Sequence, residues 1–300
     1  MIESVTLINE ETKKQVLLDM QDSDLVLKYA YFGPIDATHS SYKYPSQIGL
    51  SVTESSLGTR EVEIIGYIIG NTEEAIKRRK IELSSFLNPL QNINAVVGEY
   101  MLQFQLSNTI EFSKDEKEDN EVLCKFGITG IAYDPLWKNK TENQVTAAGI
   151  INKFKFPLII STGNEDVTKD KKLVFGMLQP SLIVAITNSG AVDTGMRIIL
   201  KAKGTVVNPT IIDINTQKYF KINKTLEVGE EIEINTSVGK KTIIGRNSLG
   251  EEKNYYKYRD LKSSWLQLSR GDNLLRYSAD SNGDLLEVKI LYNNEYIDVV

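Results

Sequence analysis

The chain has 300 residues, of which 41% are hydrophobic and 25% charged, and its 35 Lys and Arg against 40 Asp and Glu give a formal net charge of −5. These proportions are ordinary for a globular protein, and the mild acidity provides no general field for nucleic acid. The single Cys excludes an internal disulfide, and with the single His it excludes a Cys/His zinc site and limits triad-type catalysis to one imidazole.

The sequence indicates neither a membrane span nor a secretory signal. The longest apolar runs, such as residues 182–186, are much shorter than the roughly 20 residues of a membrane helix. The first residues lack the basic and apolar regions of a leader. At about 150 residues per domain, the length predicts two domains or one large one.

The first part of the chain reads mainly as β-structure. His39 lies in a small polar stretch, residues 36–41, which predicts a surface loop, and Tyr42–Val52 is predicted to be extended. Residues 62–69 alternate β-branched or aromatic residues with others, which predicts a strand. Cys124 lies in another alternating stretch and is expected to pack in a core.

One amphipathic helix is predicted over residues 71–87. Asn71 can cap it, and Glu74 then occupies the third helical position, as in a capping box. The apolar residues of its buried stripe are Ile76, Leu83 and Leu87. The basic run Lys77–Lys80 is interpreted as a solvated face rather than a nucleic-acid site, because glutamates precede and follow it.

The rest of the chain is also predicted to be β-structure, with strands over residues 128–133, 210–214, 232–234 and 286–291. The break at Asp134-Pro135 and the polar stretch after it predict a domain boundary, with domains of residues 1–140 and 141–300. Asn282-Gly283, between two apolar stretches, predicts a type I′ β-hairpin. The expected fold class is therefore mainly β, in two β-rich domains.

No stretch of the sequence predicts catalysis, a cofactor or a metal. Residues 280–284 resemble the start of a calcium loop, but Leu285 and Leu291 stand where that loop needs Gly and Glu. A wall-degrading glycosidase stays open as an alternative, because it needs only two carboxylates at a suitable separation. Trp265 and the nearby tyrosines could stack on a sugar, or could belong to the core.

Several ordered motifs resemble the siphophage distal tail protein family. In the first half they are the stretch Gly58–Ile68, the helix after it, and Leu87-Asn88-Pro89. In the second half they are Asn188-x-Gly190, Asn208-Pro209-x-Ile211, Val228-Gly229-Glu230 and Ser264-Trp265-Leu266. The resemblance implies an N-terminal ring-forming β domain with one α-helix (residues 1–140) and a C-terminal galectin-like β-sandwich (residues 141–300).

The resemblance also implies a non-enzymatic structural protein of the virion tail, made in the bacterial host cytoplasm. Such a hub forms a hexameric ring that connects the tail tube to the tail tip or baseplate and docks host-recognition proteins. The implied partners are other copies of the chain, a tail-tube protein, a tail-tip or tail-associated lysin protein, and a receptor-binding protein. Neither a membrane nor a nucleic acid is an expected direct partner.

A ring interface can use the unpaired N–H and C=O groups of a strand edge. The strand Arg60–Ile69 and the segment Tyr42–Val52 are the candidates, which gives as interface residues Arg60, Val62, Ile64, Tyr44 and Ile48. Both segments could instead be internal strands. A receptor- or carbohydrate-binding β-sandwich module of a phage tail is the alternative function.

Overall fold

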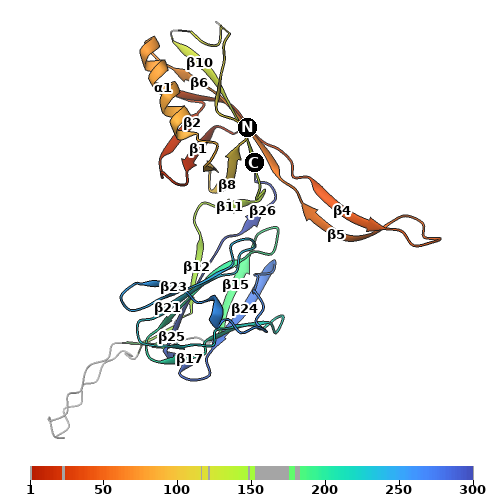
Figure 1. Ribbon diagram of the computed structural model, residues 1–300, viewed down its shortest axis with the longest axis vertical. Helices are drawn as coiled ribbons and strands as arrows, with labels where there is room; N and C mark the ends of the chain where they lie inside the picture. Colours follow the sequence, from red (N-terminus) through yellow and green to blue (C-terminus); the bar gives the residue numbers. More distant parts are fainter. Residues whose placement is uncertain are drawn as a thin grey trace, which may run out of the picture. The chain divides into compact units, whose positions relative to one another are not determined.

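The computed structural model describes residues 2–21, 24–115, 117–120, 122–147, 149–152, 176–179 and 183–299. These residues are mostly β-strand with one α-helix, which confirms the mainly β fold class (Figure 1). The chain divides into unit 1, Met1–Thr141 with Glu295–Val300, and unit 2, Glu142–Asn294. The expected ranges differ from this division chiefly in residues 295–300. These return to unit 1, because β26 (Glu295–Tyr296) pairs with β11 (Trp137–Asn139).

Unit 1 contains one large sheet and a separate hairpin. The remaining strands of the sheet are β1 (Ser4–Asn9), β2 (Gln15–Asp19), β3 (Leu25–Phe32), β6 (Arg60–Ile69), β7 (Asn92–Val97), β8 (Tyr100–Leu106), β9 (Glu111–Phe112) and β10 (Leu123–Ala132). Their order is β26-β11-β8-β7-β1-β2-β3-β6-β10-β9, and β10 also pairs with β8, which closes the sheet on itself. The pairings are antiparallel, except that β2 and β3 meet in parallel at Asp19 and Val26 alone.

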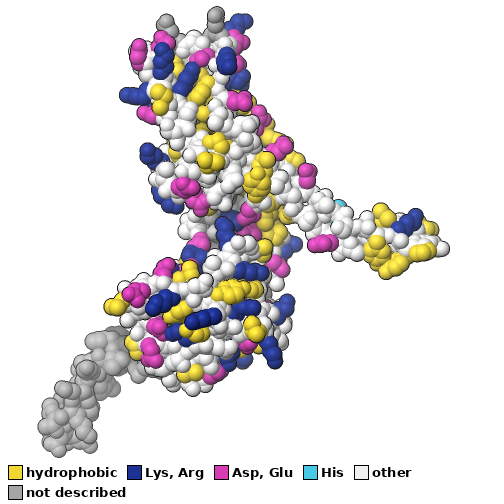
Figure 2. Space-filling view, in the orientation of Figure 1, with side chains coloured by type: hydrophobic (Ala, Val, Ile, Leu, Met, Phe, Trp, Pro, Cys, Tyr) yellow, Lys and Arg dark blue, Asp and Glu magenta, His cyan; other side chains and the backbone are white. Residues whose placement is uncertain are grey.

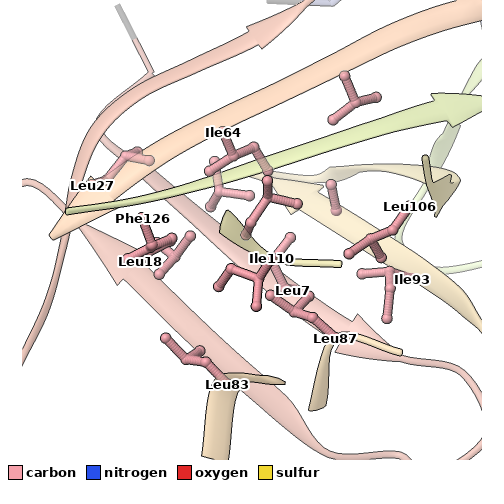
Figure 3. Close-up of a cluster of buried hydrophobic side chains, with 14 of the residues drawn as sticks. Leu7, Leu18, Leu27, Ile64, Leu83, Leu87, Ile93, Leu106, Ile110 and Phe126 are labelled. Atoms are coloured by element: carbon pink, nitrogen blue, oxygen red, sulfur yellow. The ribbon is translucent and has the colours of Figure 1, made fainter. Parts of the chain in front are cut away.

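The inward faces of these strands form the core of unit 1. Val62, Ile64 and Ile68 of β6 point inward at alternate positions, as the two-residue period of a strand requires. Figure 3 shows Ile64 in a cluster with side chains from several other strands and from the helix. Gly66 interrupts the inward series because a Cβ there would lie 2.6 Å from the ring of Phe126. Small and large residues thus interlock across β6 and β10.

Helix α1 (Glu73–Phe86) covers one side of this core, which confirms the predicted helix. Its buried residues include Ile76, Leu83 and Phe86. The predicted cap was wrong by one position: Thr72, rather than Asn71, is the N-cap, and its side-chain oxygen accepts a hydrogen bond from the backbone N–H of Ala75. The basic run on the helix is ion-paired, with partners Glu73, Glu82, Asp24 and Asp119.

The hairpin of unit 1 consists of β4 (Ala37–Tyr42) and β5 (Ser51–Leu57), which pair only with each other. It extends the β3–β6 pair and projects from the body of unit 1 (Figure 1). We call residues 37–57 the arm and residues 42–52 the arm tip. The stretch expected to be a loop around His39 is thus a strand. Its residues are polar because both faces of a free hairpin meet solvent.

Unit 2 is a β-sandwich whose two main sheets face a common core. The six-stranded sheet has the order β12 (Asn143–Ala147), β25 (Leu286–Tyr292), β16 (Met196–Ala202), β21 (Glu231–Asn235), β22 (Thr242–Arg246) and β23 (Glu252–Asn254). The four-stranded sheet has the order β15 (Ile183–Asn188), β24 (Gly271–Ser278), β18 (Thr210–Asp213) and β19 (Tyr219–Lys221). Two short pairs complete it: β13 (Gly149–Asn152) with β14 (Gly176–Gln179), and β17 (Val206–Val207) with β20 (Thr225–Leu226).

The predicted hairpin at Asn282-Gly283 was wrong, because the strands on its two sides belong to different sheets. β24 pairs with β15 and β18, whereas β25 pairs with β12 and β16. Asn282 does adopt the expected left-handed conformation (φ 57°, ψ 39°), but a 3₁₀ turn over Gly283–Leu285 follows it. The connection therefore crosses from one sheet to the other, so that alternate residues of both strands enter one core.

Candidate functional site

The arm tip carries the largest concentration of exposed apolar side chains in unit 1. Ile48 is fully exposed, and Leu50 and Tyr44 are 62% and 60% exposed. Tyr42 and Val52 at the ends of the two strands are also exposed. Figure 2 shows these hydrophobic side chains gathered at the end of the arm. The tip therefore presents an apolar surface that its own unit does not cover.

Local hydrogen bonds fold the tip. The Gln47 side chain accepts a hydrogen bond from the backbone N–H of Tyr44 at 3.0 Å and donates one to the hydroxyl of Ser51 at 2.8 Å. Ser46 and Gly49 have φ values of 67° and 83°, in the left-handed region that reverses a chain. The polar side chains thus stabilise the turn, and the apolar side chains of the tip point outward.

A two-stranded hairpin with both faces in solvent is marginally stable by itself. Every residue of β4 is exposed, and in β5 only Ser51 is partly buried. Both outer strand edges of the arm also have no strand partner among the described residues. An apolar tip and free edges together are features of a segment that another surface completes.

Three of the five predicted interface residues lie elsewhere. Arg60, Val62 and Ile64 belong to β6, which β3 and β10 cover on its two edges, and the three side chains are at most 2% exposed. The internal-strand interpretation is therefore correct for β6, and these residues are not available to a neighbouring copy. They are buried because their positions face the core of unit 1.

Arg60 has a structural role instead. Its guanidinium donates hydrogen bonds to the carbonyl oxygens of Gly33 at 2.9 Å, Pro135 at 3.0 Å and Ile297. Burial lowers the pKa of Arg60, and the nearby carboxylate of Asp298 opposes this effect. The side chain joins the base of the arm, the segment before β11 and the returning C-terminal segment.

The structure brings Tyr44 and Ile48 together at the arm tip and separates them from the β6 residues. The prediction of an extended segment over Tyr42–Val52 was wrong, because the chain reverses between the two strands of the arm. Sequence reasoning also did not single out Leu50, which lies in the same segment. It also missed Tyr29 and Tyr31 of β3, which are 44% and 41% exposed with stacked rings 6.2 Å apart. Their i, i+2 spacing on a strand was the available signal, since such residues share one face.

The outer face of the six-stranded sheet in unit 2 is occupied by an ionic network. Arg246 contacts Glu231 and Glu233 at 3.0 Å and Glu252 at 2.8 Å, and Arg197 shares Glu233 at 3.3 Å. The hydrogen bond that Arg246 donates to the carboxylate of Glu252 is the leading cause that raises the pKa of Arg246 above its usual value. These charges therefore pair with one another across neighbouring strands of the sheet.

Trp265 is packed among other side chains. Its ring lies 5.0 Å from the ring of Phe220 and 5.9 Å from that of Tyr256. The cationic groups of Lys241 and Arg259 both lie 5.7 Å from the centre of its ring. This arrangement favours the structural interpretation of Trp265 over that of a bare platform for a sugar.

Two further reactive groups, His39 and Cys124, are each without a catalytic partner among the described residues. His39 lies opposite Ser55 in the arm, with Nδ1 2.8 Å from the hydroxyl, and among the described residues no carboxylate orients this exposed imidazole. Cys124 is fully buried, and burial is the main cause that raises the pKa of its thiol to about 11. Within the described ranges, no cluster of His, Cys, Asp and Glu could hold a metal ion. None of the helices described there has the length and apolarity to cross a membrane.

Comparison with known proteins gives one family and several related folds. Residues 189–296 match the family model of the siphovirus-type tail component, C-terminal domain, which confirms the resemblance over this range. No curated protein sequence matches the chain significantly.

Solved structures resemble the chain over nearly its whole length. The SPP1 Dit protein, described as a paradigm of the hub adsorption apparatus in phages that infect Gram-positive bacteria, is 12% identical, with 97% of this chain and 98% of that one covered and a TM-score of 0.62. A chain of the phage p2 baseplate, in its activated conformation with Ca, is 11% identical, with full coverage of both chains and a TM-score of 0.53. The same baseplate with Sr gives 13% identity, 96% and 97% coverage and a TM-score of 0.53. At these identities the likeness shows the fold.

Proposed function

The chain carries a siphovirus-type tail component domain over residues 189–296, and we propose that it acts as a structural hub of a phage tail rather than as an enzyme. In this proposal, copies of unit 1 form a hexameric ring between the tail tube and the tail tip or baseplate. Unit 2 is then the outward domain that docks host-recognition proteins. The protein is made in the host cytoplasm and works in the virion tail.

The observation that carries the proposal is the arm. A ring needs a heterologous contact, in which one surface of each copy binds a different surface of the next. The arm supplies one such surface, because its apolar tip projects from unit 1 and has no cover of its own. Tyr44 and Ile48 stay as proposed interface residues, and Leu50 joins them.

The likeness to a hub protein and to baseplate chains supports the rest of the proposal. By analogy, one side of the ring contacts a tail-tube protein and the other a tail-tip or tail-associated lysin protein. A receptor-binding protein is a further proposed partner. These partners are proteins, and the proposal involves no membrane, nucleic acid, cofactor or reaction.

Negative-stain imaging of the purified protein at high concentration tests the proposal. Rings with an open lumen and six-fold symmetry are the expected result, and the addition of the tail-tube protein from the same phage should cap one side of them. Compact particles without a lumen, together with no binding to the tube or tip protein, would contradict it.

Carbohydrate binding by unit 2 is the alternative, and the exposed ring of Tyr256 beside Trp265 is the observation in its favour. A glycan array discriminates the two functions. If the hub proposal is correct, the protein binds no glycan, and Trp265→Ala lowers the stability of unit 2 only. Specific glycan binding that this substitution abolishes in a folded protein would favour the alternative.

A further inference from the structure

Strand β2 has one edge that is uncovered over most of its length. β1 pairs with its first edge from Gln15 to Asp19, but on the second edge β3 meets Asp19 alone, through Val26. From residue 15 to residue 18 no described strand covers this second edge. An uncovered strand edge is a template for another strand.

The backbone groups that this edge offers belong to Gln15 and Leu17. In an antiparallel pair, alternate residues direct both their N–H and their C=O toward the partner strand. The carbonyl of Lys14 accepts a hydrogen bond from the backbone N–H of Asn9 at 3.0 Å, so the even-numbered residues of β2 face β1. Gln15 and Leu17 therefore point their N–H and C=O groups away from β1, and no described backbone group pairs with them.

A groove lies between this edge of β2 and helix α1, and we call it the β2 groove (Figure 1). Its volume of about 870 Å³ is within the range of roughly 300–1,000 Å³ typical of binding sites. Val16 and Leu25 line it from the strands, and Ile81, Leu83 and Phe86 line it from the helix. Val16 is only partly buried, and Ile81 is 68% exposed. The groove thus combines a free strand edge with apolar side chains that unit 1 leaves uncovered.

The charge at the β2 groove is positive. Its lining holds Lys13, Lys14 and Arg79 against the single carboxylate of Glu82. Glu82 and Asp24 both pair with Arg79 at 2.9 Å. Lys13 and Lys14 are exposed, and none of the described ion pairs includes either of them. Two cations at the turn between β1 and β2 therefore have no described counter-ion.

We propose that the β2 groove binds an extended, acidic segment of a partner protein as an added strand. The segment runs antiparallel to β2, the slightly more stable arrangement, and its backbone pairs with Gln15 and Leu17. Apolar side chains at alternate positions of the segment lie against Ile81. Its acidic C-terminal end reaches Lys13 and Lys14, because an antiparallel strand ends beside the start of β2. The groove lies within one copy of the chain, so the proposal goes beyond the ring function and does not depend on it.

The chemistry of the groove favours a protein segment over other occupants. A nucleic acid matches the two lysines, but it has no strand backbone to pair with the edge of β2. The arm tip of another copy has the wrong charge, because its one charged residue is Lys43. An acidic segment with apolar residues at every second position matches the edge, the apolar wall and the charge together.

Fluorescence polarisation with a synthetic peptide tests the proposal. The probe is a run of alternating Val and Thr followed by Asp-Glu-Asp with a free C-terminal carboxylate, and it carries fluorescein at its N-terminus. Saturable binding to the full chain with a Kd below about 1 mM is the expected result. The same peptide with Lys in place of the acidic residues should bind at least about tenfold more weakly. No saturable binding, or equal binding of the two peptides, would overturn the proposal.

An oligothymidylate of the same net charge is the control for a site that attracts any polyanion. It should not bind, because it lacks a peptide backbone and alternating apolar side chains. Binding of the oligonucleotide as tight as that of the acidic peptide would overturn the proposal.

Methylation of the peptide backbone separates strand addition from charge attraction alone. In an added strand, only alternate residues direct their N–H groups to β2. N-methylation of that alternate set should abolish binding, whereas the same number of methyl groups on the other set should change the Kd by less than about threefold. Equal losses from the two sets would overturn the added strand.

Substitutions in the chain test whether the groove is the site. Leu17→Pro removes an N–H from the free edge and leaves the pairing with β1 in place, so it should abolish binding in a protein that stays folded by circular dichroism. Lys13→Glu with Lys14→Glu should weaken binding of the acidic peptide by about tenfold and strengthen that of the lysine peptide. Lys240→Glu with Lys253→Glu, at two exposed positions of unit 2, is the matched control and should change neither. Binding that survives both sets of groove substitutions would overturn the proposal.

Discussion

At the scale of single residues, Arg60 is a buried side chain that joins three segments of unit 1. It is 2% exposed, and three carbonyl oxygens from distant segments accept its hydrogen bonds. Arg60→Ala leaves these buried acceptors unsatisfied and should lower the free energy of unfolding by about 3 kcal/mol. The free energy of unfolding of Arg60→Lys should lie between those of the unsubstituted protein and Arg60→Ala, because one ammonium cannot reproduce the fork of a guanidinium.

Denaturant titration of these variants measures the effect. Arg270→Ala is the matched control, because Arg270 is exposed and forms no described ion pair, and it should change stability by less than about 0.5 kcal/mol. An Arg60→Ala protein as stable as this control would contradict the structural role of Arg60.

Cys124 should be unreactive in the folded protein. Its thiol is fully buried, and a pKa of about 11 keeps it protonated at pH 8, whereas the thiolate is the reactive form. A thiol reagent such as DTNB should label less than one tenth of the protein within minutes at pH 8, and all of it in denaturant. Rapid labelling of the native protein would show that the core around β10 opens.

The cap of α1 offers a further test at the residue scale. Thr72→Ala removes the side-chain oxygen that accepts from Ala75 and should cost about 1 kcal/mol of stability. Asn71→Ala, one residue earlier, should cost little. Thermal unfolding of the two variants distinguishes the observed cap from the one that the sequence suggested, and a larger loss for Asn71→Ala would contradict the observed cap.

At the scale of elements, strands with one buried face could be predicted, and segments set by their surroundings could not. Apolar residues alternate with others over residues 62–69 because one side of β6 faces a core. The helix could be predicted from a capping residue, an apolar stripe at helical spacing and a proline after its end. The arm strands lack a pattern because neither face is buried. Asn282-Gly283 has the local chemistry of a hairpin, but the core placed its flanking strands in different sheets.

The same reason explains why three of the five predicted interface residues are buried. A regular apolar alternation, as at Val62 and Ile64, identifies a strand with one face in the core. Residues chosen from that pattern are therefore buried and not exposed. Tyr44 and Ile48 lie instead among polar and turn residues and are exposed, although the Tyr44 ring contacts that of Tyr42, with 4.7 Å between the ring centres. Irregular apolar residues beside a turn were the better signal for exposed apolar side chains.

The arm can be removed with little effect on the fold. The carbonyl of Asp36 accepts a hydrogen bond from Gly58 N–H at 2.7 Å, so the two ends of the arm are adjacent. Deletion of residues 37–57 joins them as Asp-Gly, a pair that favours a two-residue hairpin between β3 and β6. The shortened chain should keep its circular dichroism and lose self-association. Rings formed without the arm would contradict its role.

At the scale of the whole molecule, charge is divided unevenly between the units. Unit 1 has 14 Lys and Arg against 23 Asp and Glu, whereas unit 2 has 21 against 17. A ring of unit 1 copies therefore brings like charges together, and salt screens their repulsion. In the proposed ring the apolar arm contact provides the attraction, so association should strengthen as salt rises.

The particle mass in solution, measured by sedimentation over a series of concentrations, tests the central claim most directly. With a chain of 33.8 kDa, a ring of six copies has a mass of about 200 kDa. The account predicts that this species grows with concentration and with salt, and that the arm-deleted chain stays at the mass of one copy. The mass of a single copy at every concentration and salt, for the full chain as for the arm-deleted one, would contradict the account.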